Sequence, residues 1–67
     1  MGWIVVYIAP TRSIATMLRD LLQREGLMVT VRPIRGIRTT EEAGFEILVP
    51  SSEAKDASEV LARAMGG

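Results

Sequence analysis

The segment WIVVYIAP, residues 3–10, decides which fold the chain can adopt. Its first six residues are β-branched or aromatic, a composition typical of a β-strand, and the proline ends the run. Because no polar residue interrupts the strand, both of its faces are apolar. Strict alternation places Trp3, Val5 and Tyr7 on one face and Ile4, Val6 and Ile8 on the other.

The residues that follow predict an α-helix that ends at Gly26. Thr11 is a suitable N-terminal cap, and apolar residues then recur at the three-and-four spacing of one buried stripe centred on Leu21. Gly26 can adopt the left-handed conformation that closes a helix, with Leu27 folding back on Leu22. The stripe consists of Ile14, Leu18, Leu21 and Leu22, with Met17 beside it.

Two more strands and a second helix follow from similar patterns. Residues 27–34 and 45–49 predict strands, and the segment 35–44 between them has no sustained period and predicts a long hairpin loop. After Pro50, Ser51 is expected to cap the second helix. The inner face of that helix is predicted to consist of Ala54, Ala57, Leu61 and Ala64.

These elements give one α+β domain, residues 1–67, of βαββα order. The order resembles a ferredoxin-like two-layer sandwich that lacks its last strand. Right-handed crossover then predicts a three-stranded antiparallel sheet in the order 1-3-2, with two helices on one face. The first strand becomes an open apolar edge, which predicts a homodimer joined through that strand or through the bare sheet face. The predicted interface residues are Trp3, Val5, Tyr7 and Leu48.

Composition argues against several classes of function. The chain contains eight basic and eight acidic residues, so no net charge draws it to nucleic acid or to an anionic membrane. Cysteine and histidine are absent, which removes thiolate chemistry and the usual zinc ligands. The longest apolar run is far shorter than the roughly 20 residues that span a bilayer. We therefore expect a cytoplasmic protein without a metal or cofactor.

Three segments carry a resemblance to a known family: residues 6–10 (VYIAP), the leucine-rich helix closed by Glu25-Gly26, and residues 47–54 (ILVPSSEA). The chain resembles small prokaryotic signal-transducing proteins of unknown function, whose fold is similar to that of PII nitrogen regulators. The resemblance implies that the helices cover the face of Ile4. It also implies that the loop between the second and third strands binds effectors and partners. The residues so implicated are Arg35, Gly36, Arg38, Thr39, Thr40, Glu41 and Glu42.

Three arginines step along the end of the second strand and into the loop. Arg32, Arg35 and Arg38 suggest a site for a small anion or, more weakly, for nucleic acid. The simpler interpretation is that they solubilise the hairpin and pair with nearby carboxylates of Glu41, Glu42 or Glu46. The sequence leaves both interpretations open.

The sequence favours a non-catalytic regulatory or interaction module over an enzyme. The only lysine available for a pyridoxal Schiff base is Lys55, on the predicted outer face of the second helix. The leading hypothesis is a self-associating module that offers the 35–44 loop to a protein partner or a small anion. The alternative is a sulfur-carrier or ubiquitin-like protein activated at Gly66-Gly67, although glycines that follow a helix are also typical of C-terminal capping.

Overall fold

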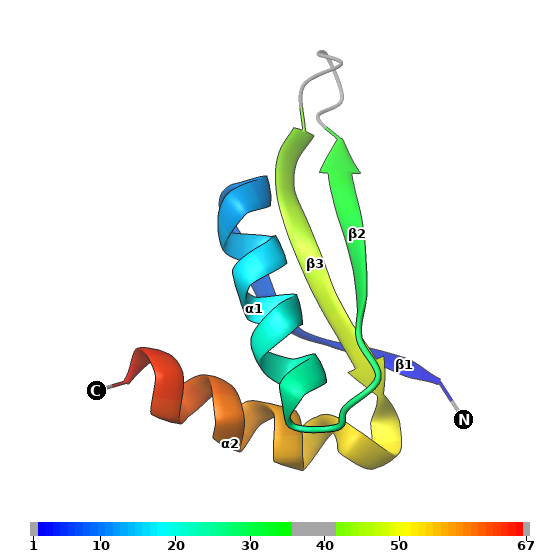
Figure 1. Ribbon diagram of the computed structural model, residues 1–67. Helices are drawn as coiled ribbons and strands as arrows, with labels where there is room; N and C mark the ends of the chain where they lie inside the picture. The colour runs from blue at the N-terminus through cyan, green and yellow to red at the C-terminus, as the bar shows by residue number, and fades with distance from the viewer. Residues whose placement is uncertain (1, 36–41, 67) are drawn as a thin grey trace.

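The computed structural model describes residues 2–35 and 42–66, except for the side chains of residues 35, 42 and 43. Its sheet has the order β1-β3-β2, and both pairings are antiparallel (Figure 1). This confirms the predicted α+β fold and strand order. The elements are β1 (Trp3–Ala9), α1 (Arg12–Arg24), β2 (Thr30–Arg35), β3 (Glu42–Pro50), a short 3₁₀ turn η1 (Ser51–Glu53) and α2 (Ala54–Met65).

Local signals set both ends of α1 as predicted. The Thr11 hydroxyl accepts a hydrogen bond from the backbone N–H of Ile14 at 3.2 Å, which satisfies one of the free donors at the start of the helix. At the other end, Gly26 has a φ of 85°, in the region that favours glycine. The Leu27 N–H donates to the Leu22 carbonyl at 3.2 Å, and the Gly26 N–H donates to the Gln23 carbonyl at 3.0 Å. This is a Schellman motif, and it turns the chain back towards the sheet.

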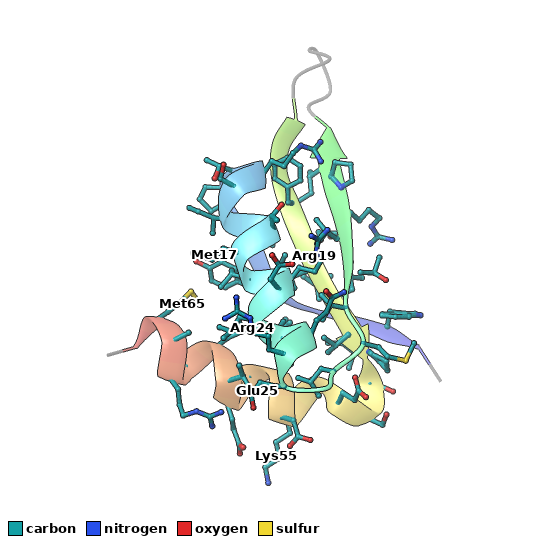
Figure 2. The ribbon with its side chains drawn as sticks, viewed as in Figure 1. Met17, Arg19, Arg24, Glu25, Lys55 and Met65 are labelled. Carbon is teal, nitrogen blue, oxygen red and sulfur yellow. The ribbon has the colours of Figure 1, made fainter. Side chains whose placement is uncertain are left out.

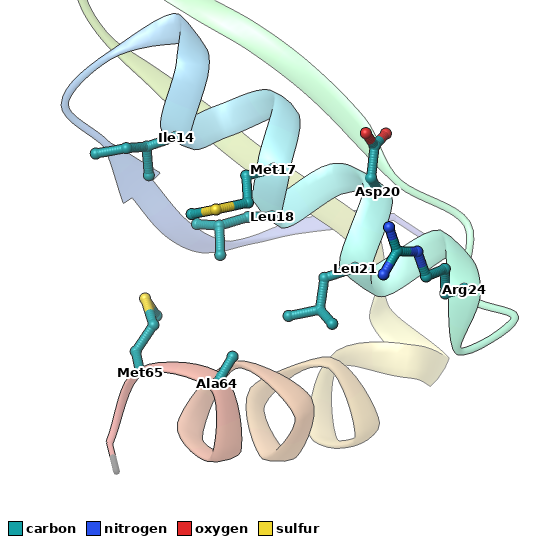
Figure 3. Close-up of a pocket in the computed structure, with 8 residues that line it drawn as sticks. All are labelled: Ile14, Met17, Leu18, Asp20, Leu21, Arg24, Ala64 and Met65. Carbon is teal, nitrogen blue, oxygen red and sulfur yellow. The ribbon is translucent and has the colours of Figure 1, made fainter.

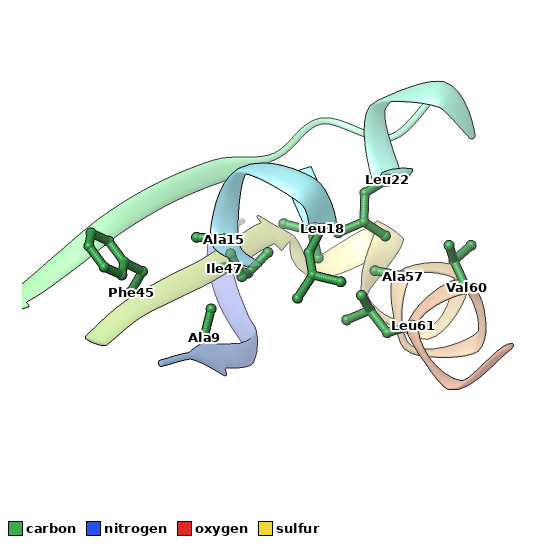
Figure 4. Close-up of a cluster of buried hydrophobic side chains, with 10 residues drawn as sticks. Ala9, Ala15, Leu18, Leu22, Phe45, Ile47, Ala57, Val60 and Leu61 are labelled. Atoms are coloured by element: carbon green, nitrogen blue, oxygen red, sulfur yellow. The ribbon is translucent and has the colours of Figure 1, made fainter. Parts of the chain in front are cut away.

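One cluster of buried side chains from β1, β3 and both helices forms the core (Figure 4). The central strand β3 contributes alternate residues, so a single face of the sheet carries the core. Both helices contribute to this same cluster, which confirms that they cover one face of the sheet. The buried members are Ala9, Ala15, Leu18, Leu22, Phe45, Ile47, Val49, Ala57, Val60 and Leu61.

The inner face of α2 differs from the predicted stripe at two positions. Val60 is buried, whereas Ala64 is exposed near the C-terminal end of the helix. The end of α2 extends past α1 rather than over the sheet (Figure 1), so Ala64 lines a hollow between the two helices instead of the core. Ala57 and Leu61 are buried as expected.

Three predicted boundaries are wrong, each because a long-range hydrogen bond or strand pairing overrides the local pattern. The Met28 N–H donates to the Glu53 carboxylate at 2.9 Å, and β2 begins only at Thr30. Ser51 opens η1 instead of capping a helix, and its N–H donates to the Gly2 carbonyl at 2.9 Å. The strands also extend into the expected 35–44 loop, because the ladder continues to the pair Arg35 and Glu42.

Among the described residues, neither helix is both long enough and apolar enough to cross a membrane.

The burial of α1 predicts a difference between two neighbouring leucines. Leu22→Ala should lower the free energy of unfolding by about 2 to 5 kcal/mol, because it leaves a cavity in a core with little material to collapse around it. Leu21→Ala removes the same atoms from a side chain that is only partly buried, so it should cost less. Urea unfolding followed by circular dichroism checks the order. Equal losses, or a larger loss for Leu21→Ala, would show that the buried stripe of α1 is rotated.

Candidate interaction surface

The sheet has one face that no described helix covers, which we call the open face. Because Phe45, Ile47 and Val49 point into the core, the alternate residues of β3 point the other way. Directly opposed residues in neighbouring strands share a face, so the strand register gives the rest of the surface. The open face consists of Trp3, Val5 and Ile8 from β1, Thr30, Arg32 and Ile34 from β2, and Gly44, Glu46, Leu48 and Pro50 from β3.

A β-bulge in β1 changes which aromatic residue belongs to this face. The register shifts between Val5 and Tyr7, so Tyr7 lies opposite Ile47, whose side chain is in the core. Val6 and Tyr7 both pack against the core cluster. Two consecutive residues therefore face the helices, which is how a bulge interrupts alternation. The expectation that Tyr7 shares a face with Trp3 and Val5 is not met.

Ile8 takes the place on the open face that alternation gave to Tyr7. It lies opposite Glu46 in the register. A Cβ added at the next open-face position of β3, Gly44, would come within 3.5 Å of Ile8 Cγ2 and 3.9 Å of Ile34 Cδ1. The two isoleucines thus flank Gly44 on the same side of the sheet. Gly44 also lies close to the Ala9 carbonyl oxygen: a Cβ atom added at position 44 would be 3.3 Å from that oxygen.

The part of the open face that belongs to β1 is apolar and accessible. Trp3, Val5 and Ile8 are 48%, 39% and 56% exposed. Leu48, beside them on the central strand, is buried, and it lines a small hollow together with Trp3, Thr30 and Arg32. Three adjacent exposed apolar side chains on a domain of this size form a patch, unlike the single apolar residues that any surface carries. Of the four predicted interface residues, Trp3, Val5 and Leu48 thus lie together.

The two charged residues of the open face, Arg32 of β2 and Glu46 of β3, pair with each other. The Arg32 guanidinium donates to Glu46 Oε1 at 2.7 Å, across the strand pair that the register sets. The Arg32 side chain is largely exposed, so solvent screens the pair and its contribution to stability is small. The pair nevertheless occupies the guanidinium that the anion-site hypothesis assigned to a ligand. The pairing interpretation for Arg32 agrees with this geometry.

Most of the residues assigned to the hairpin loop lie outside the described part of the chain. These are Gly36, Arg38, Thr39, Thr40 and Glu41. Arg35 and Glu42 are opposite one another at the ends of β2 and β3, as backbone positions. Binding of a partner or an anion by this segment therefore stays a prediction.

A groove between α1 and the C-terminal end of α2 is a second apolar surface (Figure 3). It has a volume of about 350 Å³, and Met17 and Met65 point into it from the two helices. Asp20 at its rim pairs with Arg19 at 3.1 Å. Sequence reasoning missed the groove, although a methionine beside a buried stripe is a usable signal for an adaptable apolar surface. The lining residues are Ile14, Met17, Leu18, Asp20, Leu21, Arg24, Ala64 and Met65.

The remaining candidates for chemistry are separate surface groups. Lys55 is exposed on α2 and extends away from the sheet (Figure 2). The Gly66 N–H donates to the Ala62 carbonyl at 2.7 Å, so Gly66 caps α2, while Gly67 lies outside the described residues. Within residues 2–35 and 42–66, no three acidic side chains lie close enough to hold a metal ion. The same part of the chain buries no polar or charged side chain.

Comparisons with known proteins do not place the chain in a family. No family model, curated protein or solved structure matches it. The resemblance to small signal-transducing proteins therefore stays a prediction based on the three sequence segments that carry it.

The bulge predicts opposite roles for two neighbouring residues of β1. Tyr7→Ala should lower the free energy of unfolding by about 2 kcal/mol or more, because it removes an aromatic ring that packs against the core. Ile8→Ala should cost less than about 1 kcal/mol, because the Ile8 side chain is more than half exposed. Urea unfolding of both variants at low protein concentration makes the comparison. Strict alternation requires the reverse order, so a larger loss for Ile8→Ala would exclude the bulge.

Proposed function

We propose that the protein is a non-catalytic interaction module that self-associates through the β1 side of its open face. The observation that supports this most is the accessible apolar group formed by Trp3, Val5 and Ile8. Water contact with this group is unfavourable, and the benefit of covering it increases with the apolar area removed from water. The centres of protein interfaces are similarly enriched in aromatic and apolar residues and poor in charged ones.

A second copy of the chain is the occupant that the β1 surface favours. β1 itself carries no charged residue, so two copies can approach each other there without repulsion. The other outer strand, β2, contains Arg32 and Pro33 and has an irregular register near its end. Charge, proline and irregularity are the usual means by which proteins protect a sheet edge. β1 has only its bulge, and is therefore the edge at which we place the contact.

The finer assignment of the fold belongs to the same proposal. The order β1-β3-β2 with two helices on one face is compatible with a ferredoxin-like arrangement. In that arrangement a fourth strand would lie beside β1, which is the position that a second copy would take. The proposal also includes a regulatory role similar to that of PII-like proteins, which the sequence resemblance supports. In that role the hairpin between β2 and β3 is the site for a partner or small anion.

Self-association predicts a mass above that of the 7.3 kDa chain. At tens of micromolar, sedimentation equilibrium should give a mass near that of two chains, decreasing on dilution. The single tryptophan, Trp3, should show fluorescence at shorter wavelength in the dimer, because its environment becomes less polar.

A matched pair of variants locates the contact. Trp3→Ser should weaken the dimer, whereas Met17→Ser removes a more exposed apolar side chain from α1 and should leave it unchanged. A single-chain mass at every concentration would reject the proposed function. Equal weakening by both variants would place the contact elsewhere.

A further inference from the structure

The free edge of β1 presents only certain backbone groups to a neighbour. The Gly2 carbonyl accepts a hydrogen bond from Ser51, so the backbone of Gly2 points towards β3. In an antiparallel pair, successive residues point their N–H and C=O groups alternately to the two sides. Ile4, opposite Val49 in the register, therefore also points towards β3. Trp3 and Val5 point their backbone donors and acceptors away from the sheet.

The regular part of this edge is short. The bulge between Val5 and Tyr7 breaks the alternation, so the described edge has one uninterrupted pair of outward residues, Trp3 and Val5. By the same alternation Pro33, opposite Phe45, lies at an outward position of β2, where it has no N–H to offer. Within the strands that the structure describes, only β1 thus has successive outward-pointing residues that each offer both an N–H donor and a C=O acceptor.

We infer that two copies of the chain pair through β1 in antiparallel fashion, with Trp3 of each copy opposite Val5 of the other and the two-fold axis at Ile4. The inference rests on the proposed self-association and specifies its geometry. This register uses both outward residues of each copy in regular pairs. Centring the pair on Val5 instead would place Trp3 against the bulge of the second copy, where the ladder is interrupted.

The side chains around Ile4 agree with this register, whereas Ile8 lies beyond the segment that the second copy covers. On the open face, Trp3 lies next to Val5 of the second copy, so two accessible apolar side chains cover each other. On the helix side, Ile4 is 42% exposed in the single chain, although its face belongs to the core. The two-fold axis places Ile4 against its own counterpart, in a pair without direct hydrogen bonds, where the side chains are closest. The contact thus covers an apolar residue that the helices leave accessible.

The size of the contact sets its strength. In this register residues 2–6 of the two copies lie side by side, roughly 16 Å of strand, and the smallest dimension of the molecule is 17 Å. An edge contact of these dimensions covers roughly 280 Å² per copy, about a third of a standard protein interface. The dimer should therefore dissociate on dilution rather than behave as an obligate assembly.

Cysteine cross-linking tests the register, because the chain has no cysteine of its own. In the proposed dimer the Cα atoms of the two Ile4 residues are about 4.5 Å apart, within the range that a disulfide bridges. Under mild oxidation, most of the Ile4→Cys protein should become a covalent dimer. Ile8→Cys is the control on the same strand, since its two copies lie eight positions apart, or about 26 Å. It should remain a monomer.

Three outcomes separate the register from the proposed function. Preferential linking of Ile4→Cys, with dimeric wild type in sedimentation, supports both. If the wild type is dimeric but Ile4→Cys does not form a covalent dimer, the β1 register is overturned and self-association is retained. The same conclusion follows if Ile8→Cys cross-links as readily as Ile4→Cys. Monomeric wild type overturns both.

A second pair of variants repeats the test without cysteine. Val5→Pro removes the outward N–H and should abolish the dimer, while Val5→Thr keeps the N–H and the branched shape and should retain it. Circular dichroism identifies folded variants. A folded Val5→Pro protein that still forms the wild-type dimer would overturn the inference.

Discussion

Every layer of this small domain depends on β3, the one strand that has a neighbour on each side. Its inward-facing residues Phe45, Ile47 and Val49 form the apolar surface against which both helices pack. A chain of 67 residues buries only about 60% of the surface that it exposes when unfolded, so it can form one apolar core of this kind and no second one. The outer strands consequently have one paired edge and one covered face each, and their remaining surfaces must be made compatible with water or with another molecule.

The parts of the fold that short-range chemistry decides could be predicted from the sequence. Thr11 and Gly26 act on backbone groups within a few residues, and both behave as their residue types predict. The strand order follows from chain connectivity, which the element order already contains. The bulge could not be predicted in this way: in a run where every residue is apolar, the packing of both Val6 and Tyr7 against the core leaves no mark in the pattern. The start of β2 depends on Glu53, a residue 25 positions away from its partner Met28, and no local signal links the two.

The candidate surface was partly predictable for the same reason. Trp3, Val5 and Leu48 were correctly grouped because they lie in regular stretches of the ladder, while Tyr7 and Ile8 exchanged faces beyond the bulge. The open face is divided between an apolar half on β1 and the Arg32–Glu46 pair on the other side. The charged pair keeps its part of the face compatible with water, and the exposed large apolar side chains of the face lie on β1, the strand whose edge is free.

The two edges of the sheet also limit how far assembly can proceed. If both edges accepted a strand, copies would add to each other in an open series, which is the geometry of a fibre. At β2, Pro33 lacks a donor and the register shifts between Ile34 and Arg35, so that edge is a poor template. At β1, the bulge restricts regular pairing to the segment around Ile4, and a two-fold contact there occupies the outward groups of both copies. An isologous pair formed in this way leaves no equivalent edge for a third copy, so the irregularities of the outer strands favour a closed dimer over an extended sheet.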